Sequence, residues 1–190
     1  MTQPVLSRTL FVANLALYEI GWFATVLGAA AHHPWLGPAL TVPIVAWHIY
    51  SAQSAWREGA LIVAVTVLGG TLDALLTARG WLVFPEAGVL PGIQPWWMLA
   101  LWTQLATTLN VSLRWLRARP RLAAAFAAVG APLAYAGGAR LGAVSIAAPV
   151  PAFVALALGW PLVLLVALSL ARTLDGYRAH GRTAAVGAPA

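Results

Sequence analysis

The chain has 190 residues, of which 61% are hydrophobic and only 8% charged. Its net charge is +6, and all of its positive side chains are arginines, because it contains no lysine. Since a soluble domain usually carries about a quarter charged residues, this composition excludes a water-soluble globule and a disordered chain. The absence of cysteine excludes a disulfide scaffold, cysteine-ligated metals and thiol catalysis. The mean hydropathy of +0.81 instead indicates an integral membrane protein.

Stretches of about 20 apolar residues between helix breakers predict six transmembrane helices. They run from about Thr9 to Ala31, Leu36 to Gln53, Gly59 to Ala78, Trp96 to Leu113, Leu122 to Ala139 and Val150 to Ala171. A loop rich in proline and glycine, residues 79–95, precedes the fourth. We therefore expect an all-α bundle of six transmembrane helices over residues 1–172, followed by a flexible cytoplasmic tail over 173–190.

The arginines predict the orientation of these helices. With six spans, one side of the membrane carries Arg8, Arg57, Arg114, Arg117, Arg119, Arg121, Arg172, Arg178 and Arg182, and the other carries only Arg79 and Arg140. By the positive-inside rule, both termini are expected in the cytoplasm of a multi-pass protein of the bacterial inner membrane. A cleaved signal peptide is the alternative for the first span, although Asn14 and Glu19 interrupt its apolar stretch.

Polar and deep aromatic side chains within the spans are the candidate ligand-binding residues, because a charge at this depth costs about 2.5–3.5 kcal/mol. Each of them is equally a candidate for a structural contact between helices. They are Asn14, Tyr18, Glu19, Trp22, His48, Asp73, Trp102, Thr107 and Asn110.

The most specific predictions concern two carboxyl groups, those of Glu19 and Asp73. Glu19 lies near the middle of the first span beside Trp22. There it either joins two helices by a hydrogen bond, or carries a proton or contacts a ligand. Asp73 shares a stripe of glycines and threonines in the third span, which places it toward the bundle interior. We expect Asp73 to form an ion pair with Arg79 or Arg140.

The fourth span carries a polar stripe at helical spacing, formed by Thr103, Thr107, Asn110 and Arg114. Asn14, His48 and Asn110 are predicted at similar depth, and they would converge on a pocket that opens inward. This pocket would lie between the first, second and fourth spans, with Trp22 and Trp102 as apolar walls. The alternative is that the stripe only joins helices, at roughly 0.6 kcal/mol per hydrogen bond.

Several other patterns are weak indicators of function. Gly138 and Gly142 have the spacing of a close helix contact in the fifth span. The arginine-rich segment 114–121 favours membrane insertion and anionic lipid headgroups over nucleic acid. His32 and His33 indicate a capped turn rather than a metal site. We find no phosphate loop, nucleophile elbow or zinc-protease motif, so neither catalytic residues nor a cofactor nor a metal is assigned.

The sequence nevertheless resembles a known family over nearly its whole length. The resemblance rests on Gly21 to Phe23, Val26 to Ala29, His33 to Pro38, Leu72 to Leu76, Pro95 to Trp102, Ala106 to Leu116, Ala131 to Tyr135 and Arg140 to Ala143. These segments resemble a small bacterial inner-membrane family catalogued as domain of unknown function 2878, and residues 107–116 are the most specific part. The resemblance implies a polytopic membrane protein without an established activity.

Three functions are consistent with this sequence. The first is binding or transport of a small amphiphile or lipid in an intramembrane pocket, as in the substrate-binding subunits of vitamin transporters, whose size and span count are similar. The second is a lipid- or isoprenoid-modifying enzyme, with Glu19 or Asp73 as acid and His48 as base. The third is a structural or assembly subunit for a partner in the membrane, which would present a lipid-facing seam of small residues such as that around Gly138.

Overall fold

The computed structural model describes residues 7–86 and 92–177, and this part of the chain is almost entirely helical. The α-helices are α1 (Arg8–Ala30), α2 (Leu36–Ser51), α3 (Ala55–Ala78), α4 (Trp96–Thr108), α5 (Pro120–Leu141) and α6 (Pro149–Thr173). A 3₁₀-helix, η1 (Arg114–Ala118), follows α4. Two short strands, β1 (Leu82–Val83) and β2 (Ser145–Ile146), complete the fold.

Four of these helices are long and apolar enough to cross a membrane: α1, α3, α5 and α6, with 23, 24, 22 and 25 residues. The other two are shorter, since α2 has 16 residues and α4 has 13. The fourth span was expected to continue to Leu113, but α4 ends at Thr108. There the hydroxyls of Thr107 and Thr108 bond the carbonyls of Gln104 and Leu105, and turns lead into η1.

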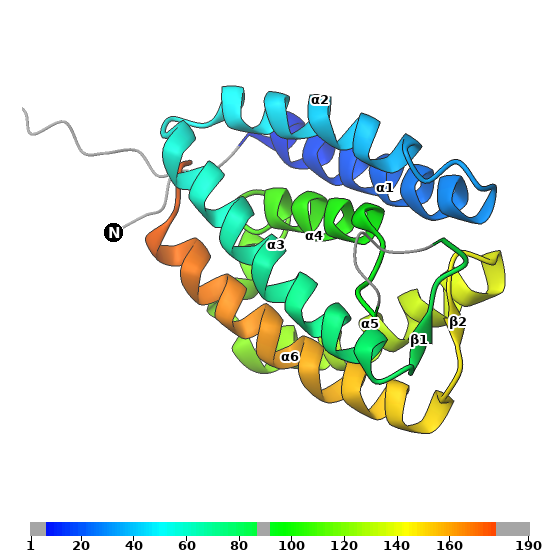
Figure 1. The fold of residues 1–190 in the computed structure, drawn as a ribbon. Helices are drawn as coiled ribbons and strands as arrows, with labels where there is room; N and C mark the ends of the chain where they lie inside the picture. Colours follow the sequence, from blue (N-terminus) through cyan, green and yellow to red (C-terminus); the bar gives the residue numbers. More distant parts are fainter. Residues whose placement is uncertain (1–6, 87–91, 178–190) are drawn as a thin grey trace, which may run out of the picture.

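Consecutive helices run up and down between two ends of the bundle (Figure 1). At one end the α2–α3 turn meets the chain after α6, because Gln53 and Ser54 donate backbone hydrogen bonds to the Gly176 carbonyl. At the other end β1 pairs antiparallel with β2, with Leu82 opposite Ile146. We call the first the arginine-rich end, because it holds Arg57, Arg114, Arg117 and Arg172, and the second the β-strand end.

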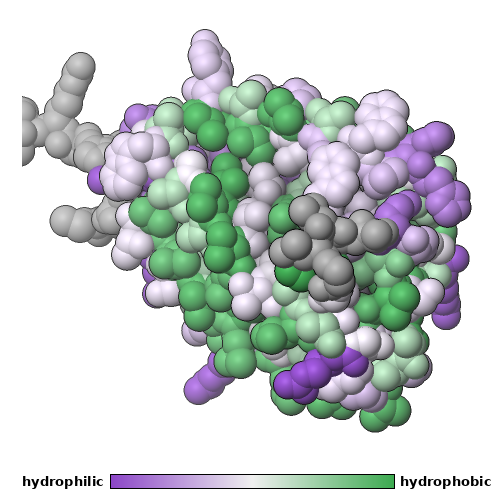
Figure 2. Space-filling view, in the orientation of Figure 1, coloured by the Kyte–Doolittle hydropathy of each residue, from purple (hydrophilic) through white to green (hydrophobic). Residues whose placement is uncertain are grey.

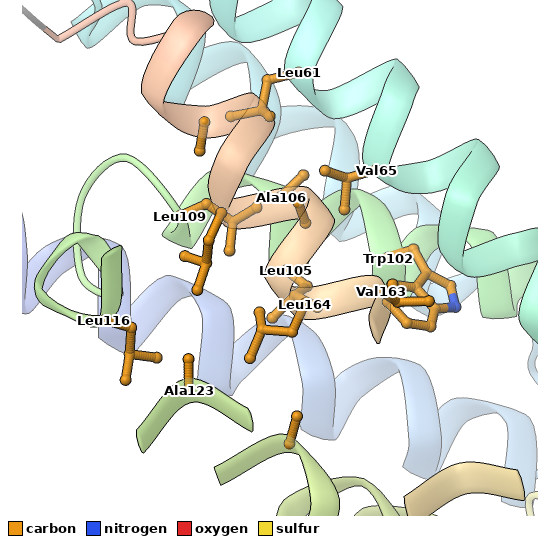
Figure 3. Close-up of a cluster of buried hydrophobic side chains, with 14 of the residues drawn as sticks. Leu61, Val65, Trp102, Leu105, Ala106, Leu109, Leu116, Ala123, Val163 and Leu164 are labelled. Atoms are coloured by element: carbon orange, nitrogen blue, oxygen red, sulfur yellow. The ribbon is translucent and has the colours of Figure 1, made fainter. Parts of the chain in front are cut away.

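Helix α4 is the centre of the bundle and packs against α1, α2 and α3. Its residues from Gln104 to Thr108 are all buried, and so are Trp97 and Trp102. The larger hydrophobic core joins α4 to α3, α5 and α6, and Figure 3 shows Leu105 and Ala106 of α4, together with Leu109 just after it, within this core. A second core lies toward the β-strand end and includes Trp97, Leu82 and Leu156.

The outer surface of the bundle is apolar. Large side chains such as Val42, Leu133 and Val150 are 66–76% exposed. Figure 2 shows hydrophobic residues dominating the face presented there, while hydrophilic residues lie mainly at its margins. A soluble protein rarely exposes so much contiguous apolar surface. The apolar surface and the four long helices indicate a protein embedded in a membrane.

Candidate functional site

A cleft of about 90 Å³ lies between α1, α4, α5 and α6, in the half of the bundle toward the β-strand end. Each helix contributes aromatic or aliphatic side chains to it. The lining consists of Tyr18, Trp22, Val26, Trp97, Met98, Leu101, Trp102, Leu105, Ala134, Tyr135, Gly138, Ala143, Val144 and Trp160. Such a lining suits an apolar group.

Asp73 lies behind the aromatic wall of this cleft and is completely buried. The indole Nε1 of Trp102 donates a hydrogen bond of 2.6 Å to its Oδ2 atom, and the Tyr135 hydroxyl donates to its Oδ1 atom. The expected ion pair with Arg79 or Arg140 is therefore wrong. The physical reason is that both carboxylate oxygens already have aromatic donors within the bundle, while the Arg79 guanidinium lies over the Trp81 ring.

Close packing fixes the positions of the Trp102 and Trp160 indole rings. Trp102 stacks on Trp160 with ring centroids 4.2 Å apart and planes at 23°. On its other side Trp102 presses against α3 at Gly69, where an added Cβ atom would lie 2.0 Å from the indole. Gly69 belongs to the stripe of small residues recognised in the sequence, so its role is to admit Trp102.

A second buried carboxylate, Glu58, lies at the arginine-rich end. Its Oε2 atom is 2.8 Å from His48 Nε2, and its Oε1 atom accepts hydrogen bonds from Asn110 Nδ2 at 2.5 Å and the Gly176 backbone at 2.7 Å. The Tyr177 hydroxyl donates to the His48 carbonyl at 2.6 Å. Burial raises the pKa of Tyr177, and Glu58 adds to the increase, so the phenol stays protonated as a donor.

The expected tail, residues 173–190, begins within this packed structure. Asp175 is buried and forms ion pairs with Arg114 at 2.9 Å and Arg117 at 3.0 Å. Burial lowers the pKa of the Arg117 guanidinium, and Asp175 opposes that shift. The segment Leu174–Tyr177, the C-terminal latch, therefore closes the arginine-rich end; residues 178–190 lie outside the described part of the chain.

Asn14 and Gln104 join helices elsewhere in the bundle. Asn14 donates to the Thr107 carbonyl at 3.1 Å, and its Oδ1 atom accepts from the Ser112 hydroxyl at 2.7 Å. Gln104 donates to Thr41 of α2 at 2.6 Å and to Thr25 of α1 at 3.3 Å. Asn14 thus joins α1 to the end of α4 and the turn after it, and Gln104 joins α4 to both α1 and α2.

The polar residues predicted to line a pocket between the first, second and fourth spans thus do not all converge on one point. His48 and Asn110 do meet, but they meet on Glu58 and are fully buried, whereas Asn14 has other partners. The predicted apolar walls, Trp22 and Trp102, line the cleft on the α5 side of α1 instead. Close packing explains the difference, because Gly37 of α2 lies directly against α1.

The remaining candidates are dispersed. Tyr18 lines the cleft, Thr107 is buried against Gln104, and Glu19 is exposed on α1. Glu19, His48 and Asp73 are thus in different surroundings, and the acid–base combination expected of an enzyme is not assembled.

The glycine seam of the fifth span also differs from expectation. Gly138 is buried in the cleft, while α5 ends at Leu141, so Gly142 is not on the same helix face. Gly142 caps the helix with a φ of 91°, a conformation that favours glycine. No seam facing lipid is formed by this pair.

Sequence reasoning missed several residues of these clusters. Glu58 was left in a loop because the third span was expected to begin at Gly59, whereas α3 begins at Ala55. An acidic residue directly before an apolar span was the available signal. Tyr135 and Trp160 were not predicted to meet Trp102 and Asp73, since nothing in one sequence pairs α5 with α6.

These features define a helical, membrane-embedded protein with an aromatic cleft and two buried carboxylate clusters. The family model described as "Protein of unknown function (DUF2878)" matches residues 11–166, and the chain belongs to this family. The resemblance found in the sequence is confirmed, and it brings no activity with it. No curated protein and no solved structure matches the chain.

Proposed function

We propose that this protein binds or transports a small amphiphile or lipid in the cleft between α1, α4, α5 and α6. The observation that supports this most is the pairing of an apolar, aromatic lining with Asp73 directly behind it. Ligand sites combine a mostly apolar wall with a few placed polar groups. The Tyr135 hydroxyl supplies such a group here, because its oxygen can still accept a hydrogen bond from a ligand while its proton is donated to Asp73.

The proposal places all six helices across the bacterial inner membrane, with both termini in the cytoplasm. The arrangement of the helix ends supports this, because Arg57, Arg114 and Arg172 belong to one end of the bundle, and Arg79 and Arg140 to the other. Exposed tryptophans at both ends, Trp56 and Trp115 against Trp35 and Trp96, suit the two interfaces. The shorter α2 and α4 would cross with their adjoining turns.

Mass spectrometry of the protein purified from native membranes tests the binding proposal. Wild-type protein is expected to retain a lipid, and a Gly138→Leu variant, which fills the cleft, is expected to lose it. Gly137→Leu is the matched control, since an added Cβ atom there meets nothing within 4 Å. Equal retention by both variants, or wild-type protein without bound lipid, would contradict the proposal.

A second candidate, a lipid- or isoprenoid-modifying enzyme, is favoured by one contact only. The Tyr135 phenol borders the cleft while bonded to the Asp73 carboxylate, and such a pair can hold or pass a proton. In that case Tyr135→Phe protein would retain an unreacted lipid of a different mass from the lipid on wild-type protein. Identical masses would exclude turnover at this residue.

A further inference from the structure

The cleft has an open flank between α1 and α5, and this flank faces the surroundings of the bundle. Helix α1 packs mainly against α2 and α4 and contacts α5 only weakly. Ala134 lines the cleft and is itself exposed, and its neighbour Leu133 is 66% exposed. In a membrane this flank meets lipid chains, so a ligand can enter sideways from the bilayer.

Glu19 stands beside this opening. In a helix, residues three and seven positions apart share a face, and Trp22 and Val26, which line the cleft, are three and seven positions after Glu19. Glu19 is exposed, and it forms no hydrogen bond or ion pair with any other described residue of the chain. A carboxyl group that faces lipid without a partner is costly.

The depth of Glu19 restricts what can meet it. It is the central residue of α1, which spans Arg8–Ala30, so it lies about 16 Å from either end of the helix. Half the hydrocarbon core is about 15 Å thick, and a phospholipid keeps its charged headgroup at the surface. A lipid whose only polar group is a hydroxyl brings that group to this depth at lower cost.

We propose, building on the lipid-binding function above, that the ligand is a long-chain alcohol. Its chain would lie in the cleft among Trp22, Trp97 and Tyr135, and its hydroxyl would donate a hydrogen bond to Glu19 at the opening. Glu19 is then a specificity-determining residue, because it distinguishes an alcohol from a hydrocarbon or a phospholipid. The carboxyl group gains a partner only when the ligand is bound.

Photolabelling in vesicles of phosphatidylethanolamine and phosphatidylglycerol tests this inference. The probes are diazirine-bearing hexadecanol, the corresponding hexadecane and a diazirine-bearing phosphatidylcholine, and peptide mapping measures labelling of residues 134–144. We expect Glu19→Leu to reduce labelling by the alcohol about fivefold, as the loss of one hydrogen bond predicts. Glu19→Gln, which still accepts a hydrogen bond, should lose less, and labelling by hexadecane should not change.

Ile20→Leu is the control, because it alters the neighbouring lipid-facing position of α1 without changing its polarity. Equal labelling of wild-type and Glu19→Leu protein by hexadecanol, or stronger labelling by phosphatidylcholine, would overturn the alcohol as ligand and leave lipid binding intact. If no probe labels the cleft of the wild-type protein, the proposed function itself fails.

Discussion

At the residue scale, the fully buried carboxylates Asp73 and Glu58 have different kinds of partner. Asp73 is held by two aromatic donors beside the cleft, whereas Glu58 is held by His48, Asn110 and a backbone amide at the arginine-rich end. In hydrocarbon or in protein, a buried charge persists only when its oxygens are bonded. Each carboxylate therefore joins several helices at a single point.

Removal of Asp73 should destabilise the bundle. In Asp73→Ala the Trp102 indole and the Tyr135 hydroxyl both lose their acceptor, and each unsatisfied buried donor costs about 1–3 kcal/mol. We expect a clear fall in the thermal unfolding temperature in detergent. Asp73→Asn, which keeps one acceptor oxygen, should fall less; an unchanged midpoint for Asp73→Ala would show that these hydrogen bonds contribute nothing.

Loss of the Glu58 carboxylate should release the C-terminal latch. In Glu58→Ala the Gly176 amide loses its acceptor, and His48 and Asn110 lose a partner. Hydrogen exchange at residues 174–177 is expected to accelerate by about tenfold or more. Thr71→Ala is a suitable control, because the Thr71 hydroxyl is exposed and bonds only its own helix. Unchanged exchange in Glu58→Ala would disprove the latch.

At the element scale, α3 and α4 meet through a glycine. A side chain at Gly69 would collide with the ring of Trp102, and overpacking of this kind costs typically about 1–3 kcal/mol. Gly69→Ala should therefore lower the unfolding midpoint and shift the tryptophan fluorescence of the cleft. Gly59→Ala in the same helix has open space around it and should be neutral or stabilising by up to about 1 kcal/mol. Similar midpoints for the two variants would contradict this packing.

The positions of the helices could be predicted from the sequence, but their partners could not. Breakers such as Pro34 and the proline-rich loop 79–95 bound the apolar stretches, and the arginines indicate which ends lie together. Helix α4 ends at Thr108 because the chain turns at residues 109–113 and enters η1, and the hydropathy of these residues does not register that turn. The fourth span was therefore predicted too long.

In the candidate site, too, the buried polar residues could be predicted from the sequence, but their partners could not. Polarity at depth correctly singled out Asp73, His48, Asn110 and Asn14 as buried residues with polar partners. Which partners they have depends on how α5 and the C-terminal latch fold back, and one sequence holds no signal for that. Glu19 was expected near other helices, and it is instead on the exposed side of α1.

At the scale of the whole molecule, the absence of cysteine makes the predicted orientation directly testable. Single cysteines at Arg121 and at Arg140 lie at opposite ends of α5. In intact bacterial cells a membrane-impermeant maleimide should label Arg140→Cys and not Arg121→Cys, and lysis should expose both. Labelling of Arg121→Cys in intact cells would reverse the orientation.

A crystal structure of the protein grown from a lipid mesophase would show directly whether a lipid chain occupies the aromatic cleft. We expect continuous electron density for an alkyl or isoprenoid chain between Trp22 and Tyr135, entering from the flank between α1 and α5. A structure in which α1 closes on α5 and these two side chains fill the space would contradict this expectation.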